Sequence, residues 1–383
     1  MKYEERVTSD AINVTDLKLL SNLPKILEFE NGAPVLTKED FAKRRLELYK
    51  YAVEFQYGTT PPAPQVFKVD PLYITGYGKA NVYRITAGTK EKTVSFRLKL
   101  MLPKKEHLKE GKLPVIVDGD MCFCYAMNQE YLNAALENGI AWALFDRTEI
   151  VPDYKYAKRA DGPLYSAYPD LDFGAIMAWA WGYSRVVDAL EIIGLTDPDC
   201  IAFSGHSRGG KTALLAGAID QRAAIVNPNE SGAGGSGCYR VHMKGSYMGQ
   251  EEKRSEELGD LVNNFPHWLG TKTHDFIDRE SDLPFDQHYL KALVAPRILF
   301  ISEAAGDVWT NPVGTYLTNQ AAKSAFDLLG AGENLLWYWR HGPHYHEIID
   351  VQTLAGVINH KKYGTPLPER MFDVPFDPEI LEN

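Results

Sequence analysis

The sequence predicts an α/β fold with a mostly parallel central sheet and helices packed on both of its faces. Short apolar segments that suit buried strands alternate along the chain with segments of helical periodicity. The segment Leu113–Asp118 ends in a polar residue before Gly119, which is typical of a buried parallel strand that opens into a loop. Strands and helices that alternate in this way form parallel sheets with helical crossovers.

The predicted elements follow in chain order. An amphipathic helix is expected at 38–57, and Tyr57-Gly58 with the prolines that follow ends it. Segments with alternating apolar residues predict strands at 66–74, 80–86 and 92–102. Further strands are expected at 113–118, 141–145, 200–204, 223–226, 297–302 and 335–339, and further helices at 130–138, 174–193 and 211–219.

The chain is expected to consist of a helical lead-in at 1–60 and one large α/β domain at 61–383. Between about 236 and 295 the alternation of strands and helices breaks, which predicts an insertion over the carboxyl edge of the sheet. The charged run in this stretch, Glu251 to Glu257, is interpreted as a solvated helix face. A turn is expected at 197–199, where two aspartates flank a proline.

Composition narrows the classes of partner. The 383 residues carry a formal net charge of −10, which argues against nucleic acid and anionic membranes, because both need a basic surface. No apolar run is long enough to cross a bilayer, and the polar start of the chain lacks the apolar segment of a signal peptide. A cytoplasmic location is expected, or secretion if a leader was removed. The four cysteines form no CxxC pair and are expected to be reduced.

The stretch Gly205-His206-Ser207-Arg208-Gly209 follows an apolar strand and opens a helix. This is the context of a nucleophile elbow, in which a tight turn needs glycine on both sides and lifts the serine above the sheet. Ser207 is therefore the predicted nucleophile of a serine hydrolase with the α/β-hydrolase fold. The backbone N–H of Arg208 is expected to stabilise an oxyanion.

The base of such an enzyme comes late in the chain, after the nucleophile and the acid. His341, His344 and His346 cluster just beyond the strand at 335–339. We expect His344 to be the base, with His346 as the second candidate. Three histidines also suit a metal, but their spacing is poor for one site and no carboxylate motif completes it. Neither a metal nor a cofactor is therefore predicted.

Two acids and one lysine are further candidates. Glu230 follows the strand at 223–226, and Asp307 follows the strand at 297–302, so both lie at carboxyl ends of predicted parallel strands, where ligands bind. Either can serve as the acid of the triad. Lys211 comes one helical turn after Ser207 and faces the same way, where it could meet a carboxylate of the substrate.

These residues resemble the glucuronoyl esterases, which form carbohydrate esterase family fifteen. The resemblance extends over about residues 40 to 365 and is most specific in Gly205-His206-Ser207-Arg208-Gly209-Gly210-Lys211 and Glu230-Ser231-Gly232-Ala233-Gly234-Gly235. It implies a serine esterase that cleaves a carboxylic ester of a carbohydrate, most directly a 4-O-methyl-glucuronate ester, without a cofactor. An acetylxylan or acetyl esterase, and a non-catalytic carbohydrate-binding homologue, are the alternatives.

The resemblance also implies a role for each matched residue. Arg208 would add its side chain to the oxyanion hole, Lys211 would bind the glucuronate ring, and His344 would be the base. Glu230 matches the acid of the well-studied members, and Asp307 matches a second acid position of some bacterial members. Trp268 and Trp309 are candidates for stacking on the sugar. Many members have cysteine, often in a disulfide, where this chain has His206.

Overall fold

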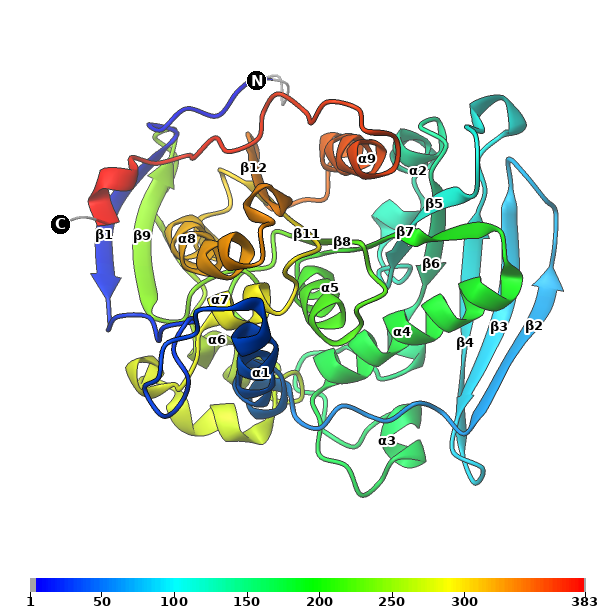
Figure 1. Cartoon of the computed structure of the whole chain (residues 1–383), viewed down its shortest axis with the longest axis horizontal. Coiled ribbons are helices and arrows are strands. Elements are labelled where there is room, and N and C mark those ends of the chain that lie inside the picture. Colours follow the sequence, from blue (N-terminus) through cyan, green and yellow to red (C-terminus); the bar gives the residue numbers. More distant parts are fainter. Residues whose placement is uncertain (1–4, 382–383) are drawn as a thin grey trace.

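A nine-stranded sheet runs through the middle of the molecule. The computed structural model describes residues 5–381 (Figure 1). The expectation that a signal peptide is absent rests in part on residues 1–4, which lie outside the described residues. The strands are, in spatial order, β12 (Leu335–Arg340), β11 (Ile298–Ala304), β8 (Ile225–Asn229), β7 (Thr196–His206), β5 (Leu113–Asp118), β6 (Ala141–Phe145), β4 (Thr93–Met101), β3 (Ala80–Gly88) and β2 (Val66–Tyr73).

The direction of these strands matches the predicted parallel sheet. The run from β12 to β6 is parallel throughout, and β4, β3 and β2 extend it by antiparallel pairing. Four neighbouring strands, β7, β8, β11 and β12, therefore end at the same edge of the sheet. All the predicted site residues except Trp268 lie in the segments that follow these four strands.

Helices cover both faces of the sheet (Figure 1). On one face lie α2 (Gln129–Leu136) and α9 (Ile348–Tyr363), and on the other lie α4 (Ala175–Ile193), α5 (Arg208–Ile219) and α8 (Pro312–Leu328). Alternate residues of β5 point to opposite faces: Val115 and Val117 join the core with α4 and α5, and Ile116 joins the core with α2 and α9. The remaining α-helices are α1 (Lys38–Tyr49), α3 (Pro163–Ala167), α6 (Leu258–Asn264) and α7 (Gln287–Ala292).

Local sequence determines where several helices begin and end. At the start of α1, the Thr37 hydroxyl accepts from the Asp40 N–H and the Asp40 side chain accepts from the Thr37 N–H, which is a capping box. The Asn311 side chain accepts from the Gly314 N–H at the start of α8. Gly194, with a φ of 73°, ends α4 in the left-handed conformation that glycine favours.

A second, three-stranded sheet joins the N-terminal segment to the predicted insertion. β1 (Ile12–Leu19) pairs antiparallel with β9 (Val241–Tyr247), and β9 pairs with β10 (Lys253–Arg254). The described part of the lead-in therefore contains a strand as well as a helix. The alternation of apolar residues in β1 is interrupted at a register shift between Val14 and Asp16, which hides the strand from a period-two pattern.

Two local predictions were wrong. Asp197 to Asp199 is not a turn but part of β7, which pairs with β5 across a register shift between Leu113 and Val115. The charged run at 251–257 is not a helix face: it contains β10, and the Glu256 side chain beyond it is 11% exposed and pairs with a lysine. The charged residues alone could not show whether the segment is solvated or, as here, places Glu256 against the buried Lys211.

Within residues 5–381, none of the helices combines the length and the apolar character needed to cross a bilayer.

Candidate active site

Ser207 lies on the bend between β7 and α5 in a strained backbone conformation. Its φ of 57° and ψ of −119° are sparsely populated outside glycine, and its N–H donates to the Asn229 carbonyl at 2.9 Å. A Cβ on Gly205 would lie 2.5 Å from the Gly209 carbonyl oxygen, and one on Gly209 would lie 2.1 Å from Asp120 Oδ2. The bend is therefore the strand-to-helix turn that the motif predicts, with the serine at the positive end of α5.

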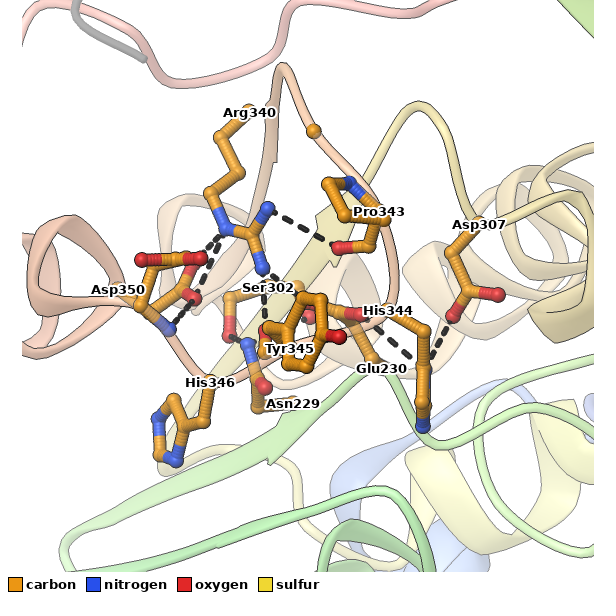
Figure 2. A network of polar contacts seen from close by, with 12 residues as sticks. Asn229, Glu230, Ser302, Asp307, Arg340, Pro343, His344, Tyr345, His346 and Asp350 are labelled. Atoms are coloured by element: carbon orange, nitrogen blue, oxygen red, sulfur yellow. Dashed lines mark hydrogen bonds and ion pairs between the residues drawn. The ribbon is translucent and has the colours of Figure 1, made fainter. Parts of the chain in front are cut away.

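His344 lies beyond β12, with its ring between two carboxylates (Figure 2). Its Nδ1 is 2.5 Å from Asp307 Oδ2 and 3.2 Å from Glu230 Oε2. Both acids approach the same ring nitrogen, which leaves Nε2 as the nitrogen that can exchange a proton with a substrate or a nucleophile. His344 and Ser207 line the same cavity.

The other two histidines of the loop are engaged elsewhere. The His341 Nδ1 is 2.9 Å from the Tyr247 hydroxyl. The His346 Nδ1 is 2.5 Å from the Tyr131 hydroxyl, and burial lowers the pKa of His346 to about 3. Of the three candidate histidines, His344 is the one that lines the same cavity as Ser207.

A buried arginine holds Glu230 in place (Figure 2). Arg340 Nη2 donates to Glu230 Oε1 at 2.5 Å, and Arg340 Nε donates to Asp350 Oδ2 at 2.9 Å. The three side chains are almost completely buried, so each charge depends on the others for compensation. Arg340 is the last residue of β12, and Asp350 is in α9, so the pair also ties the histidine loop to the sheet.

The charges around His344 shift its titration. Burial on its own lowers the pKa of His344, but the hydrogen bonds and charges of Asp307 and Glu230 outweigh burial and raise it to about 10. Burial raises the pKa of Glu230 to about 8, against the opposing effects of His344 and Arg340. Asp307 is the nearer of the two acids and makes the larger contribution to the upward shift of the His344 pKa.

The cavity at this edge of the sheet measures about 250 Å³. All the predicted site residues except Asp307 line it, and Asp307 reaches it through His344. Trp309 is 38% exposed, whereas Trp268 is 2% exposed and one of its faces stacks on Phe265 with the ring centroids 3.9 Å apart. The two tryptophans therefore offer different surfaces to a ligand. The lining residues are Ser207, Arg208, Lys211, Glu230, Ser231, Glu256, Asp260, Asn264, Phe265, Trp268, Trp309, Thr310 and His344.

Lys211 is engaged by the protein itself. Its Nζ donates to the carbonyls of Ser231 and Ala233, at 2.7 and 2.5 Å, and to Glu256 Oε2 at 2.8 Å. These three acceptors use the three donors of an ammonium group. Lys211 therefore fixes the loop after β8 and brings the Glu256 carboxylate into the cavity wall, in addition to lining the cavity itself.

Arg208 extends from the start of α5 across two aromatic rings. Its guanidinium carbon lies 4.9 Å from the Phe265 ring centroid and 4.8 Å from that of Trp268. Its Nη1 is 3.3 Å from Asp153 Oδ1, which also accepts from Trp268 Nε1 at 3.2 Å. The side chain is thereby directed along the cavity wall next to Ser207.

Comparison with known proteins agrees with this arrangement. A family model described as "Glucuronyl esterase, fungi" matches residues 85–330, which is more than half of the chain. The chain belongs to this family. Membership of the glucuronoyl esterases confirms the resemblance that the elbow motif indicated.

Two curated relatives are 4-O-methyl-glucuronoyl methylesterases. The enzyme of Podospora anserina is 31% identical over 312 residues, which is 80% of this chain and 60% of that protein. The enzyme of Hypocrea jecorina is 30% identical over 335 residues, or 86% of this chain and 67% of that protein. The chain thus spans about 60% of the length of the first relative and two thirds of the second.

Solved structures of glucuronoyl esterases have the same fold. The carbohydrate esterase family 15 glucuronoyl esterase from Caldicellulosiruptor kristjansonii superposes with a TM-score of 0.80 at 30% identity and covers 94% of both chains. The glucuronoyl esterase catalytic domain from Hypocrea jecorina gives 0.74 at 24% identity, over 100% of this chain and 97% of that one, and so shows the fold alone. The predicted α/β-hydrolase fold is confirmed.

His206, which precedes Ser207 in the elbow, contacts an amide and two imidazole rings. Its Nδ1 is 2.6 Å from Asn229 Oδ1, and its ring lies 4.6 Å from the His344 ring and 5.4 Å from the His346 ring, centroid to centroid. In this member of the family, packed rings thus connect the elbow to the histidine loop. Three of the four cysteines, Cys122, Cys200 and Cys238, are free thiols.

Sequence reasoning missed the residues that support the site. Glu256 was hidden in a charged run, and Asp153 and Arg147 carry no motif. Arg340 had a local signal, because a charged residue at the end of an otherwise apolar strand needs a buried partner. The partner itself, 110 positions away in the chain, could not be read from that signal.

In the described part of the chain, three side chains lie close enough together to hold a metal ion. Ring nitrogens of His206 and His344 and a carboxylate oxygen of Glu230 lie within 4.8 Å of one another. Each of these residues already has protein partners: Asn229 for His206, Asp307 for His344 and Arg340 for Glu230. Their contacts are those of a hydrogen-bonded acid–base group, which needs no cation to compensate the charge.

Proposed function

We propose that this chain hydrolyses a carboxylic ester of a carbohydrate, most directly a 4-O-methyl-glucuronate ester, through an acyl-enzyme on Ser207. The observation that carries the proposal is the shared cavity of Ser207 and His344, with both acids at His344 Nδ1, so that Nε2 remains for proton exchange. A serine, an imidazole and an orienting carboxylate are the parts that acyl transfer needs.

In the first step the Ser207 hydroxyl attacks the ester carbonyl carbon, and His344 Nε2 takes the hydroxyl proton. The imidazolium that forms is stabilised by Asp307 at 2.5 Å and Glu230 at 3.2 Å. The tetrahedral intermediate then breaks the bond to the alcohol, which leaves with the proton from His344. Because two carboxylates share one ring nitrogen, the orienting role is divided between them.

The oxyanion that develops on the carbonyl oxygen needs donors. The first is the backbone N–H of Arg208, which follows the nucleophile at the start of α5. The loop after β5 commonly supplies the second, but here the N–H groups of Gly119, Asp120 and Met121 donate to Tyr183, Asp118 and Phe145. The guanidinium of Arg208, directed along the cavity wall, is therefore assigned to this role.

The second half of the reaction releases the acid. His344 removes a proton from a water molecule, whose oxygen attacks the acyl carbon. The intermediate collapses, the bond to Ser207 Oγ breaks, and the serine recovers its proton from His344. The products are a carboxylic acid and an alcohol, so the cycle consumes one water and needs neither a metal nor a redox cofactor.

A sugar is the substrate that the cavity wall favours. Trp309 exposes an aromatic surface next to Asp307, which suits stacking on a pyranose ring. Glu256 and Lys211 form an ion pair at the wall, where the carboxylate can accept from sugar hydroxyls. The names of the curated relatives supply the choice of a 4-O-methyl-glucuronoyl ester over other carbohydrate esters.

The test compares ester classes on purified protein. The chain is expected to hydrolyse a methyl ester of 4-O-methyl-glucuronate and to react with a fluorophosphonate probe, and Ser207→Ala is expected to abolish both. Faster turnover of acetylated xylose would instead support the acetyl esterase. Unchanged turnover in Ser207→Ala would overturn the serine mechanism, and a lack of both labelling and turnover in the intact protein would support a binding protein without catalysis.

We expect the partner of this site to be a small ester or an oligosaccharide ester. The net charge of −10 remains the argument against a nucleic acid. A cytoplasmic location stays a prediction, and so does its alternative, secretion after removal of a leader.

A further inference from the structure

One buried carboxylate, that of Asp153, holds two side chains of the cavity wall. Its Oδ1 accepts from Arg208 Nη1 at 3.3 Å and from Trp268 Nε1 at 3.2 Å. Its Oδ2 accepts from Arg147 Nη2 at 3.0 Å. The Asp153 side chain is 4% exposed, so these three donors replace the water that the carboxylate would otherwise bind.

Arg147 connects this contact to the elbow. Its Nη1 donates to Asp120 Oδ1, and Asp120 Oδ2 accepts from the N–H of His206 at 2.8 Å. His206 precedes Ser207 in the chain. The buried guanidinium of Arg147 thus binds two carboxylates. Asp120 binds the backbone of the elbow, and Asp153 binds the side chain of Arg208.

The contact matters because an arginine side chain is otherwise free to adopt many rotamers. The Arg208 side chain is 28% exposed, so water competes for it on one side. Asp153 and the rings of Phe265 and Trp268 limit it from the other sides. A donor for an oxyanion is effective when it is already oriented before charge develops, because little reorganisation is then left for the reaction itself.

We propose that Asp153 is a positioning residue of the oxyanion hole, which acts through Arg208 and is itself held by Arg147. This inference rests on the proposed function, in which the Arg208 guanidinium stabilises the oxyanion. It goes beyond that function by assigning a residue 55 positions away from Arg208 in the chain. An exposed pair of the same type would contribute little, but this carboxylate is buried and bonded on both oxygens.

The first experiment is Asp153→Asn, which removes the charge and keeps the size of the side chain. We expect kcat for the glucuronate methyl ester to fall about 10- to 100-fold, which is less than the roughly 10²- to 10³-fold loss seen when an oxyanion donor itself is removed, because Arg208 is still present. KM is expected to change less than about 3-fold, because an interaction made only in the transition state affects kcat and kcat/KM alike. Rates are expressed per active site labelled by the fluorophosphonate, so that loss of folded protein does not count as loss of catalysis.

The decisive measurement is a double-mutant cycle with Arg208→Ala. If Asp153 acts through Arg208, adding Asp153→Asn to Arg208→Ala has no further effect on kcat. Independent effects that multiply in the double variant would overturn the proposal, because Asp153 would then support the site by another route. An unchanged kcat in the single variant Asp153→Asn would overturn it as well.

Asp188→Asn is the matched control. Asp188 also binds two arginines, Arg185 Nε at 2.6 Å and Arg222 Nη1 at 2.7 Å, but it is in α4 and does not line the cavity. Its loss is expected to leave kcat unchanged. If Asp153→Asn does not fold, Trp268→Phe replaces it: the ring stays over Arg208 but the Nε1 donor to Asp153 is lost. A fall in kcat that disappears in the Arg208→Ala background supports the proposal, and an unchanged kcat contradicts it.

The proposed function and the positioning role of Asp153 can be rejected separately. Retained esterase activity in Ser207→Ala would reject the proposed function, whatever Asp153 does. Normal dependence on Ser207 together with an unaffected kcat in Asp153→Asn would reject only the positioning role. The rate of fluorophosphonate labelling gives a second readout that does not need the sugar, since the phosphoryl oxygen of the probe enters the same hole.

Discussion

In each half of the cavity a buried arginine bridges two carboxylates, and one of these carboxylates holds a side chain that lines the cavity. On the histidine side Arg340 bridges Glu230 and Asp350, and Glu230 meets His344 (Figure 2). A second acid, Asp307, approaches the same ring nitrogen. This half therefore has two carboxylates for one catalytic group.

On the arginine side Arg147 bridges Asp153 and Asp120, and Asp153 meets Arg208. No second carboxylate is recorded on Arg208 within the described residues. The group held here is a guanidinium, which keeps its charge over the whole accessible pH range. On the histidine side, two acids therefore control the proton of His344. On the arginine side, the single acid Asp153 orients the side chain of Arg208.

The largest effect is expected when both acids of the histidine side are neutralised. Asp307→Asn together with Glu230→Gln should lower kcat about 10³- to 10⁴-fold, as does loss of the orienting acid in other serine hydrolases. Asp307→Asn alone should cost less, roughly 10- to 100-fold, because Glu230 still pairs with the ring. Steady-state kinetics on the glucuronate ester tests this order, with Asp327→Asn on the exposed part of α8 as a neutral control.

A different result would change the comparison. If Glu230→Gln alone caused the whole loss and Asp307→Asn caused none, the contact of 2.5 Å would be structural and the histidine side would have a single working acid.

The next largest effect concerns stability on both sides. Arg340→Met and Arg147→Met each leave two carboxylates buried without their shared cation, so each is expected to lower the free energy of unfolding by about 3–5 kcal/mol. Urea unfolding measures this loss. Arg279→Met is the control, because Arg279 and its partner Asp282 are 61% and 50% exposed and an exposed pair is worth at most about 1 kcal/mol. If only one of the two variants lost stability, the acids on the other side would be compensated by hydration or protonation.

The pH dependence should separate the two sides. Burial lowers the pKa of His344, but Asp307 and Glu230 outweigh burial and raise this pKa to about 10. A base must be unprotonated, so kcat/KM is expected to rise with pH well beyond the usual histidine value of about 6.5. Asp307→Asn removes the strongest of the contributions that raise this pKa, and the rise should then move to lower pH.

The same profile in Asp153→Asn should be lower in height but unshifted along the pH axis, because Asp153 contacts Arg208 and not the His344 ring. A shift of equal size in both variants would show that the two halves of the cavity are electrostatically coupled, and the distinction between proton control and positioning would not hold.

The sequence predicts the parts of the site that are local motifs, but not the contacts between distant residues. The elbow at Ser207 and the loop of His344 were predicted because each is a local pattern at the end of an apolar strand. The joint use of Glu230 and Asp307 stayed open, since it depends on the distance of each acid to one nitrogen. Sequence order places both acids after parallel strands but gives no distance.

The bridging arginines could not be predicted at all. Arg340 and Glu230 are 110 positions apart, and Arg147 and Asp120 are 27 apart, with no motif to connect them. Charged residues inside apolar stretches indicate that a partner exists, but many acids in a chain of this charge could serve. Only the packing of the sheet against its loops selects one.

The smallest effect distinguishes the two tryptophans. Trp309 lies two residues after Asp307 and is 38% exposed, so Trp309→Ala should raise KM about 5- to 10-fold with little change in kcat, as expected when uniform binding is lost. Trp309→Phe keeps an aromatic surface and should restore most of the affinity. Trp268 is 2% exposed, and its ring and N–H serve Arg208 and Asp153, so Trp268→Phe should lower kcat and leave KM near its original value. If both tryptophans changed KM alone, the ring of Trp268 would contact the sugar directly, and the arginine side would bind substrate as well as orient a charge.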